Sequence, residues 1–251
     1  MREKWQGMMT IARFNWPFYV AAVAVLIAAL CGLLLFRAPE LKLVCGAALL
    51  AATYFLFGSL CVSHLIYDRS DLYRWNWIDR ALRNAPRRDF IFCHSGFDES
   101  SEALREKLGD VGWQVLDHFN EPQMTEASIR RARRMFPPTA STLPAPHNHW
   151  PVSAGCADVV FGLLAIHEFR SEAERSEWFS EARRCLRKEG EGRAVIVEHV
   201  RDLANFLAFG PGFLHFHSPG SWRKDWERAG FRSLDEFRIT PWVRVFVLVA
   251  S

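Results

Sequence analysis

Phe90-Ile-Phe-Cys93 begins the part of the chain that decides the fold. Three similar runs follow it, namely Gln114-Val-Leu116, Asp158-Val-Val-Phe-Gly-Leu-Leu164 and Ala194-Val-Ile-Val197. Each run is short, continuous and rich in β-branched or large apolar residues, and stretches with a helical pattern separate them. This alternation is typical of strands buried on both faces of a parallel sheet. The sequence therefore predicts an α/β fold with a mostly parallel sheet.

Polar residues follow all four runs. Ligands of open α/β sheets bind beyond the carboxyl ends of the strands, so we expect these residues to lie around a ligand. They are His94, Asp117, His118, His167, Glu168, Glu198 and His199.

The composition limits the class of protein. The 251 residues are 50% hydrophobic, which suits one ordinary domain and an accessory segment, and the net charge of +3 gives nucleic-acid binding little support. The six cysteines show no paired C-x-x-C spacing. We therefore expect small buried thiols in a reducing compartment, without disulfides or a structural zinc site.

Two uncharged apolar stretches, Pro17 to Phe36 and Leu43 to Leu65, precede this part of the chain. Each is long enough as a helix to cross a hydrocarbon core of about 30 Å. The short polar link between them predicts a transmembrane helical hairpin over residues 1–66. A secretory signal fits poorly because the first apolar run is long and a second follows at once. A pair of soluble core helices remains an alternative.

The distribution of Lys and Arg predicts the orientation of the hairpin. Basic residues precede the first stretch and follow the second, whereas the link holds only Arg37 and Lys42. The positive-inside rule then places both termini and the α/β domain in the cytoplasm, as part of a multi-pass inner (cytoplasmic) membrane protein.

Residues 67–88 are predicted to be a juxtamembrane amphipathic connector. Tyr73, Trp75 and Trp77 alternate there with charged residues. Such a segment suits a helix at the membrane surface or one that covers the ligand edge of the sheet. An ordinary amphipathic helix packed on the domain is equally compatible with the pattern.

The sequence indicates where several helices of the α/β part begin and end. Ser171-Glu-Ala-Glu174 is a capping box, Ser218-Pro219 begins a further helix, and Lys188-Glu-Gly190 is expected to close the helix that follows Ser171. Two strand-like runs, 234–240 and 242–250, meet at Pro241 and predict an antiparallel pair at the sheet edge.

The order of these elements resembles the class I S-adenosylmethionine-dependent methyltransferases, in particular the methyltransferase type 11 group. The most specific part runs from Ala157-Asp-Val-Val-Phe161 through Leu186-Arg-Lys-Glu-Gly190 to Ala194–Val197. The resemblance covers about residues 89–251. It implies a Rossmann-like, mostly parallel sheet with a C-terminal antiparallel hairpin, and S-adenosylmethionine as the cofactor.

The resemblance also implies roles for particular residues. The loop His94-Ser95-Gly96-Phe97 would wrap the methionine part of the cofactor. Asp117, with His118 beside it, would bind the ribose hydroxyls, because a carboxylate accepts two hydrogen bonds. Leu164, Ala165 and His167 would border the sulfonium and its methyl group.

The sequence departs from the family in two places. Only Gly96 remains of the usual G-x-G-x-G pattern in the first loop, and the strand expected between residues 134 and 150 is replaced by a proline-rich stretch. A catalytically degenerate protein that keeps the fold for binding or as a scaffold therefore stays open as an alternative.

Methyl transfer from an activated cofactor mainly requires alignment of the acceptor, and a base helps where the acceptor is a hydroxyl or phenol. The predicted catalytic residues are His167, Glu168, Glu198 and His199. Helix capping or strand-end hydrogen bonding is the alternative role for each of them.

The segment 205–218 is rich in Phe and Leu around Gly210-Pro-Gly212. With the membrane hairpin, this predicts a lipid-like or hydrophobic small-molecule acceptor and a membrane-anchored methyltransferase. The pairs His147-x-His149 and His215-x-His217 suggest a metal-dependent hydrolase as a further alternative. No Asp or Cys with obvious ligand spacing accompanies these pairs, so no metal site is predicted.

Overall fold

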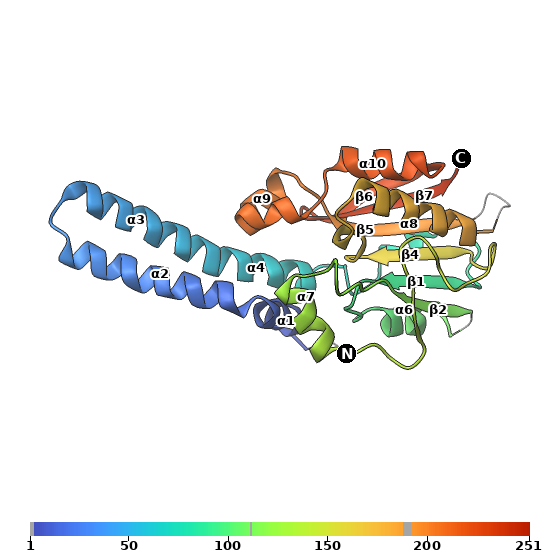
Figure 1. Cartoon of the computed structure of the whole chain (residues 1–251), viewed down its shortest axis with the longest axis horizontal. Helices are drawn as coiled ribbons and strands as arrows, with labels where there is room; N and C mark the ends of the chain where they lie inside the picture. Colours follow the sequence, from blue (N-terminus) through green and yellow to red (C-terminus); the bar gives the residue numbers. More distant parts are fainter. Residues whose placement is uncertain (1–2, 111, 188–191) are drawn as a thin grey trace.

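The computed structural model describes residues 3–110, 112–187 and 192–251. Its centre is a sheet of seven strands in the order β3-β2-β1-β4-β5-β7-β6 (Figure 1). The first five of these strands are parallel, and β7 is antiparallel to both of its neighbours. The predicted α/β fold with a C-terminal antiparallel pair is confirmed. The strands are β1 Phe90–His94, β2 Trp113–Asp117, β3 Thr142–Pro144, β4 Val159–Leu163, β5 Arg193–His199, β6 Phe231–Thr240 and β7 Val243–Ala250.

The four apolar runs form the central strands because both faces of the sheet are covered. Ile91 packs toward one face, with α8 (Glu172–Cys185) and α10 (Pro219–Arg228) above it. Phe90 and Phe92 pack toward the other face, beside α6 (Ser101–Leu108). Every residue of β1 and β4 is buried, as continuous apolar runs in a parallel sheet require.

The predicted helix starts are present. Ser171 and Glu174 form the capping box of α8, and the Ser218 hydroxyl accepts a hydrogen bond from Ser221 N at the start of α10. Helix α7 (Ala127–Met135) follows β2. Helix α8 ends at Cys185, and the predicted closure at residues 188–190 lies outside the described residues.

The weakly marked stretch between residues 134 and 150 holds the short edge strand β3, which pairs with β2 through three residues. Proline limits the length of β3, because a proline residue has no backbone N–H to donate to the neighbouring strand. Trp150 anchors the loop that follows; it is buried against Trp178 with ring centroids 5.4 Å apart.

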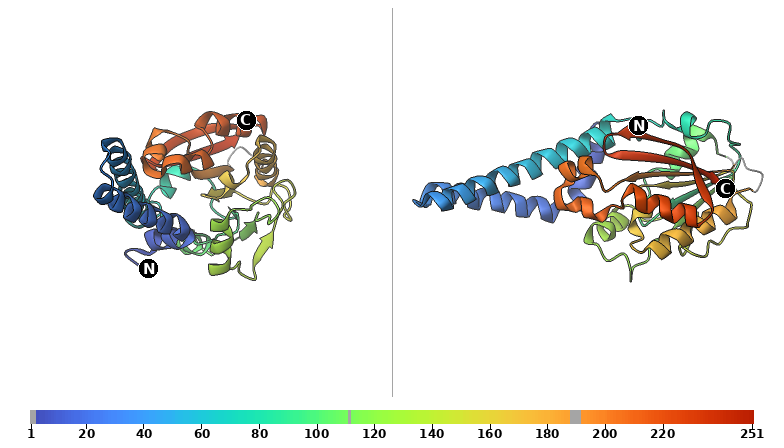
Figure 2. Two further views of the ribbon diagram at one scale, coloured as in Figure 1. Left: turned by 60° about the vertical axis from the view of Figure 1, so that its left-hand side comes forward. Right: turned by 90° about the horizontal axis from the view of Figure 1, so that it is seen from above.

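The N-terminal part projects away from the sheet as a helical hairpin (Figures 1 and 2). It comprises α1 (Gln6–Phe14), α2 (Trp16–Leu35), α3 (Pro39–Thr53), a π-helical turn (Tyr54–Gly58), α4 (Ser59–His64) and a second π-helical turn (Leu65–Arg69). Two helices, Trp16–Leu35 and Pro39–Arg69, are long and apolar enough to cross a membrane, and only 11% of each apolar window is buried. Most of their apolar surface is thus uncovered within the chain.

The segment 67–88 differs from the expected amphipathic helix. After the π-helical turn ends at Arg69, only Ile78–Ala81 (α5) is helical in this segment. Leu72, Trp77 and Leu82 are buried in the core against β1, β4 and β5. The aromatic residues therefore cover one face of the sheet, because the parallel strands there need an apolar layer and α6 alone is short. This segment packs as part of the α/β domain.

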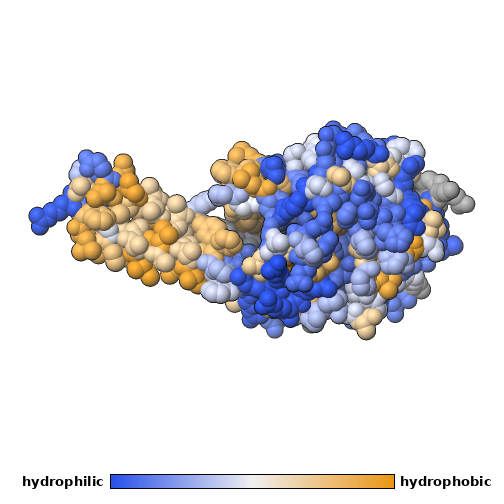
Figure 3. Space-filling model, viewed as in Figure 1, coloured by the Kyte–Doolittle hydropathy of each residue, from blue (hydrophilic) through white to orange (hydrophobic). Residues whose placement is uncertain are grey.

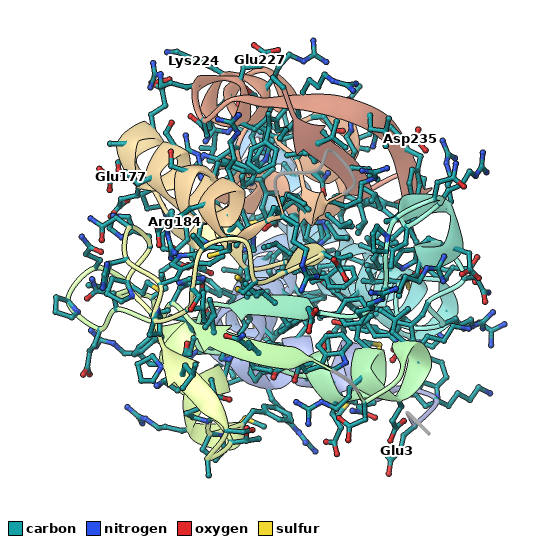
Figure 4. All side chains as sticks on the ribbon, turned by 90° about the vertical axis from the view of Figure 1, so that its right-hand side faces the viewer. Glu3, Glu177, Arg184, Lys224, Glu227 and Asp235 are labelled. Carbon is teal, nitrogen blue, oxygen red and sulfur yellow. The ribbon has the colours of Figure 1, made fainter. Side chains whose placement is uncertain are left out.

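Charged side chains cover the end of the molecule that lies away from the hairpin. Seen from that side, Glu177, Lys224 and Asp235 lie at the periphery among many other charged groups (Figure 4). On the other side of the domain, the shaft of the projecting hairpin is apolar and its tip is hydrophilic (Figure 3).

A buried ion pair joins the two helices that cover one sheet face. Arg175 Nε lies 2.6 Å from Asp225 Oδ2, and both side chains are almost fully buried. We expect Asp225→Ala to lower the free energy of unfolding by about 3–5 kcal/mol, because it leaves a buried guanidinium unpaired. Denaturation of the detergent-solubilised chain, followed by tryptophan fluorescence, measures this. Asp110→Ala, at the exposed pair with Arg105, is the matched control; equal losses in the two variants would contradict the prediction.

Candidate functional site

The carboxyl ends of β1, β2, β4 and β5 meet at one edge of the sheet, which we call the ligand edge. His94 at the end of β1 is the register partner of Asp117 at the end of β2. The turn after β4 continues the edge with His167 and Glu168, and His199 ends β5. The residues predicted from strand ends are therefore brought together.

Asp117 is held from both sides. Its Oδ1 atom accepts hydrogen bonds from Gly96 N and Phe119 N, each at 3.0 Å. Its Oδ2 atom forms an ion pair with Arg133 of α7, whose guanidinium also lies over the Phe119 ring. The carboxylate is thus fixed at the ligand edge, and a partly exposed arginine covers its outer oxygen.

The position of Gly96 has no room for a side chain. Its φ is +87°, and a Cβ atom would lie 2.8 Å from Cδ2 of Phe119. The next residue, Phe97, does not fill the space beside Asp117; its ring packs on Phe14 of α1 and on Phe136, with centroids 5.1 and 5.0 Å away. Helix α1 therefore covers the loop that follows β1.

His94 is a buried imidazole whose polar atoms are unused. It is 1% exposed, and neither ring nitrogen makes a hydrogen bond within the described part of the chain, although Nδ1 lies 3.5 Å from Asp117 Oδ1. Burial lowers its pKa from the ordinary value, so the ring is neutral near pH 7. Buried polar atoms normally have partners, which makes His94 a candidate ligand contact.

Glu198 organises the loop that follows β4. Its Oε1 atom accepts hydrogen bonds from the backbone N–H groups of Ala165, Ile166 and His167 at 3.1, 2.8 and 3.2 Å. Its Oε2 atom lies 2.6 Å from His167 Nδ1. Since the side chain is fully buried and surrounded by donors, its observed role is to position the loop.

Leu164 begins this loop with a φ of +49°, which is uncommon for a residue with a side chain. Its N–H donates to the Val197 carbonyl at 2.8 Å. Strained backbone of this kind persists where surrounding contacts determine it, and it gathers at functional sites.

His167 lies between two carboxylates. Burial alone would lower its pKa, but the charges of Glu198 and Glu168 outweigh burial and raise the pKa to about 10. Burial also opposes the charge of Glu168, yet His167 and His215 lower the pKa of that carboxyl well below its ordinary value. Near pH 7 the pair is therefore an imidazolium beside a carboxylate, and neither group is a strong proton acceptor.

His199 connects the sheet to the base of the hairpin. Its Nδ1 atom faces two acceptors, the Trp242 carbonyl at 3.0 Å and Asn205 Oδ1 at 3.2 Å, so Nδ1 carries the proton. Its Nε2 atom then accepts a hydrogen bond from the Tyr67 hydroxyl at 2.9 Å. Burial, with the nearby charge of His167, lowers the pKa of His199 to about 4.

Two further predicted residues have their side-chain groups engaged within the protein. His118 donates from Nδ1 to the Ala145 carbonyl at 2.8 Å, and its Nε2 accepts from Trp178 Nε1 at 3.1 Å. The Ser95 hydroxyl donates to the Ala165 carbonyl at 3.0 Å and so ties the loops after β1 and β4 together. The His118 imidazole therefore has no ring nitrogen left for a ligand.

The two His-x-His pairs do not act as units. His147 pairs with Glu177, whereas His149 is exposed. His217 Nε2 lies 3.2 Å from the His167 carbonyl oxygen and 3.1 Å from the Phe169 carbonyl oxygen. The His215 ring instead faces the carboxylates of Glu126 and Glu168. The hypothesis of a hydrolase built on these pairs is therefore not supported.

No local sequence pattern predicted three of the residues that lie at the ligand edge. Arg133 lies 16 positions after Asp117, and Tyr67 lies 132 positions before His199. Arg170, beside Glu168 and His215, belongs to the same group. Only the packing of distant segments brings these side chains to the edge.

Comparisons with known proteins agree with this fold. No family model matches the sequence, and no curated protein matches it. Solved structures do match. A SAM-dependent methyltransferase from Aquifex aeolicus has a TM-score of 0.50 at 13% identity, over 72% of this chain and 90% of that one. The pyocyanin biosynthetic protein PhzM has a TM-score of 0.53 at 14% identity, over 93% and 71%.

A geranyl diphosphate methyltransferase, solved with GPP and sinefungin, has a TM-score of 0.50 at 12% identity, over 75% of this chain and 82% of its own. At these identities the similarity establishes the fold. This chain has the α/β fold of those methyltransferases.

The buried neutral histidines predict acid sensitivity. Burial lowers the pKa of His118 and His199 to about 4, whereas an unfolded histidine titrates near about 6.5. Between these values the unfolded chain binds protons that the folded chain does not. The contribution of these two imidazoles to stability is therefore full above about pH 6.5 and falls toward pH 4, by up to about 1.4 kcal/mol per pH unit for each of them.

Melting temperatures at about pH 7 and about pH 5 measure this effect. We expect His118→Gln to reduce the difference between the two, because one titrating group is removed. His149→Gln, at an exposed position, should leave the difference as in the parent chain. An identical pH dependence in all three proteins would contradict the assignment.

Proposed function

We propose that this chain is a membrane-anchored S-adenosylmethionine-dependent methyltransferase that acts on a lipid-like or hydrophobic small-molecule acceptor. In this proposal residues 1–66 form the transmembrane hairpin, residues 67–88 join it to the domain, and residues 89–251 carry out methyl transfer in the cytoplasm. The observation that carries the proposal is that the ligand edge of a methyltransferase-like sheet faces the base of an apolar helical hairpin.

Contacts on both sides of the edge support this orientation. Tyr67, at the end of the second apolar helix, bonds to His199. Phe14, just before the first apolar helix, packs on Phe97, and its carbonyl accepts a hydrogen bond from Arg131 at 2.6 Å. A membrane around the hairpin would thus lie next to the mouth of the site.

The residues after β1 and β2 suit the cofactor in their chemistry. Asp117 offers a fixed carboxylate for vicinal hydroxyls, Gly96 removes a side chain from the loop, and His94 has two unpartnered ring nitrogens. The Arg133 guanidinium pairs with Asp117 and would compete with the cofactor for that carboxylate. Its side chain is 31% exposed, so it is able to turn into solvent when a ligand binds.

The cofactor, when bound, supplies an already activated methyl group, so the protein mainly aligns the acceptor and excludes water. The Glu168 carboxylate is held ionised at the edge, where it accepts a hydrogen bond from an acceptor hydroxyl and orients it. His167 is charged, and both ring nitrogens of His199 are engaged. Of the four predicted catalytic residues, we therefore assign alignment to Glu168 and a positioning role to Glu198, His167 and His199.

An apolar surface beside the hairpin supports a hydrophobic acceptor. Helix α9 (Leu203–Phe209) and the 3-10 turn after it (Gly210–His215) follow β5. The Tyr54 hydroxyl of the hairpin donates to the Leu207 carbonyl of α9. Figure 3 shows this apolar surface next to the hairpin. Its exposed side chains are Leu203, Phe206, Leu207 and Leu214.

A non-catalytic binding or scaffold protein is the second candidate. The ion pair between Arg133 and Asp117 favours it, because that carboxylate is already neutralised within the chain. The reduced glycine pattern, with Gly96 alone, points the same way. Cofactor affinity separates the two candidates.

Calorimetric titration of the full-length chain in detergent with S-adenosylmethionine tests the enzyme proposal. We expect one equivalent to bind. Asp117→Asn should weaken binding roughly 10–100-fold, because hydrogen bonds to a charged group contribute about 1.5–3 kcal/mol. Asp110→Asn, at an exposed position, should bind as the parent chain does. No binding, or binding unaffected by Asp117→Asn, would favour the scaffold candidate.

The acceptor class has its own test. Membranes that contain the chain are incubated with methyl-labelled cofactor and then extracted with organic solvent. We expect label in the organic phase, and roughly 10–100-fold less of it with Asp117→Asn at cofactor concentrations below the Kd. Label confined to water-soluble products would contradict a lipid-like acceptor while leaving methyl transfer intact.

A further inference from the structure

Three potential metal ligands converge at the ligand edge, where the segments after β4 and after α9 meet. His167 and Glu168 belong to the 3-10 turn Ile166–Glu168 after β4, and His215 ends the turn Gly210–His215 after α9. One ligand atom from each lies within 4.8 Å of the others. Segments 48 positions apart, at His167 and His215, thus supply one cluster.

The spacing suits a small cation. His167 Nε2 lies 3.5 Å and His215 Nε2 lies 3.6 Å from the same atom, Glu168 Oε1. Bonds of about 2.0–2.1 Å to a tetrahedral ion place neighbouring ligand atoms roughly 3.3 Å apart. Small movements of these side chains would therefore close the coordination sphere.

Both imidazoles are oriented in the same way. His167 Nδ1 faces Glu198 Oε2 at 2.6 Å, and His215 Nδ1 faces Glu126 Oε1 at 3.0 Å. The His167 Nδ1–H therefore donates to Glu198. His215 Nδ1 faces both Glu126 and the Arg170 guanidinium, and it would donate to Glu126 once Arg170 has left. Each Nε2 lies toward Glu168. Histidines that bind metals characteristically donate their other N–H to a carboxylate, which fixes the tautomer and the ring.

A partly exposed cation lies beside the cluster. Arg170 Nη2 contacts the His215 ring, lies 2.5 Å from Glu126 Oε1, and lies 3.9 Å from Glu168 Oε2. Its side chain is 41% exposed, so it can leave for solvent without becoming a buried unpaired charge. The guanidinium thus neutralises the acidic groups that a metal ion would otherwise neutralise.

We propose that His167, Glu168 and His215 bind a divalent first-row transition metal of the zinc type, with Arg170 as the competing cation. Two imidazoles and one carboxylate are the ligand chemistry that zinc, iron and nickel accept. Binding of the metal would release the Nε2 proton that the His167 imidazolium carries near pH 7. Three protein ligands leave a coordination position open. In a further step that rests on the proposed methyl transfer, an oxygen of the acceptor would take this position.

Zinc binding by the full-length chain in detergent, after removal of metals with a chelator, tests the site. Calorimetry with Zn²⁺ alone should show one equivalent bound, and Co²⁺ should give the absorption bands of a tetrahedral ion. His215→Ala and Glu168→Gln should each weaken binding at least about tenfold. Arg170→Ala should strengthen it, because the competing guanidinium is gone.

His147→Ala is the matched control, since His147 is also a partly exposed imidazole paired with one carboxylate, Glu177. It should bind zinc as the parent chain does. Circular dichroism establishes that the variants are folded. Absence of stoichiometric binding, equal losses in His147→Ala and His215→Ala, or no gain in Arg170→Ala would each overturn the site. Because no cofactor is present in this titration, its outcome is independent of S-adenosylmethionine binding.

Discussion

Glu198 has no exposure to solvent, yet its carboxylate stands at the end of the central strand β5. A charge in that position is tolerated only when it is fully hydrogen-bonded, and three consecutive backbone N–H groups and the His167 imidazole satisfy it. The loop after β4 must wrap around the carboxylate to do so. This requirement explains the left-handed backbone at Leu164 and places His167 and Glu168 at the ligand edge.

The ligand edge is asymmetric in its surroundings. On the side of β1 and β2, α1 and Phe14 cover the first loop. On the side of β5, Tyr67 joins the base of the hairpin to His199, and the apolar helix α9 lies beside the hairpin. A protein with separately folding anchor and domain would need none of these contacts. Their presence couples the position of the hairpin to the shape of the site.

Two arginines occupy corresponding places in the two halves of the edge. Arg133 neutralises Asp117, and Arg170 neutralises Glu126 and lies near Glu168. Both side chains are partly exposed, so a ligand can replace them without burying a free charge. The edge is therefore electrostatically satisfied without a ligand. Binding of a cofactor or metal would exchange one counter-charge for another.

The amino-acid sequence by itself determined the sheet, its antiparallel end, the helical hairpin and the set of polar residues at the strand ends. These follow from local rules, since buried parallel strands need continuous apolar runs and Ser171 and Ser218 cap helices through neighbouring residues. Only the tertiary structure decided that aromatic residues of 67–88 enter the core and that Arg133 pairs with Asp117. It also decided that His215 lies in a cluster with His167 and Glu168, whereas the sequence pattern had grouped His215 with His217. Those pairings depend on where distant segments meet, and local hydrogen bonding and periodicity carry no information about that.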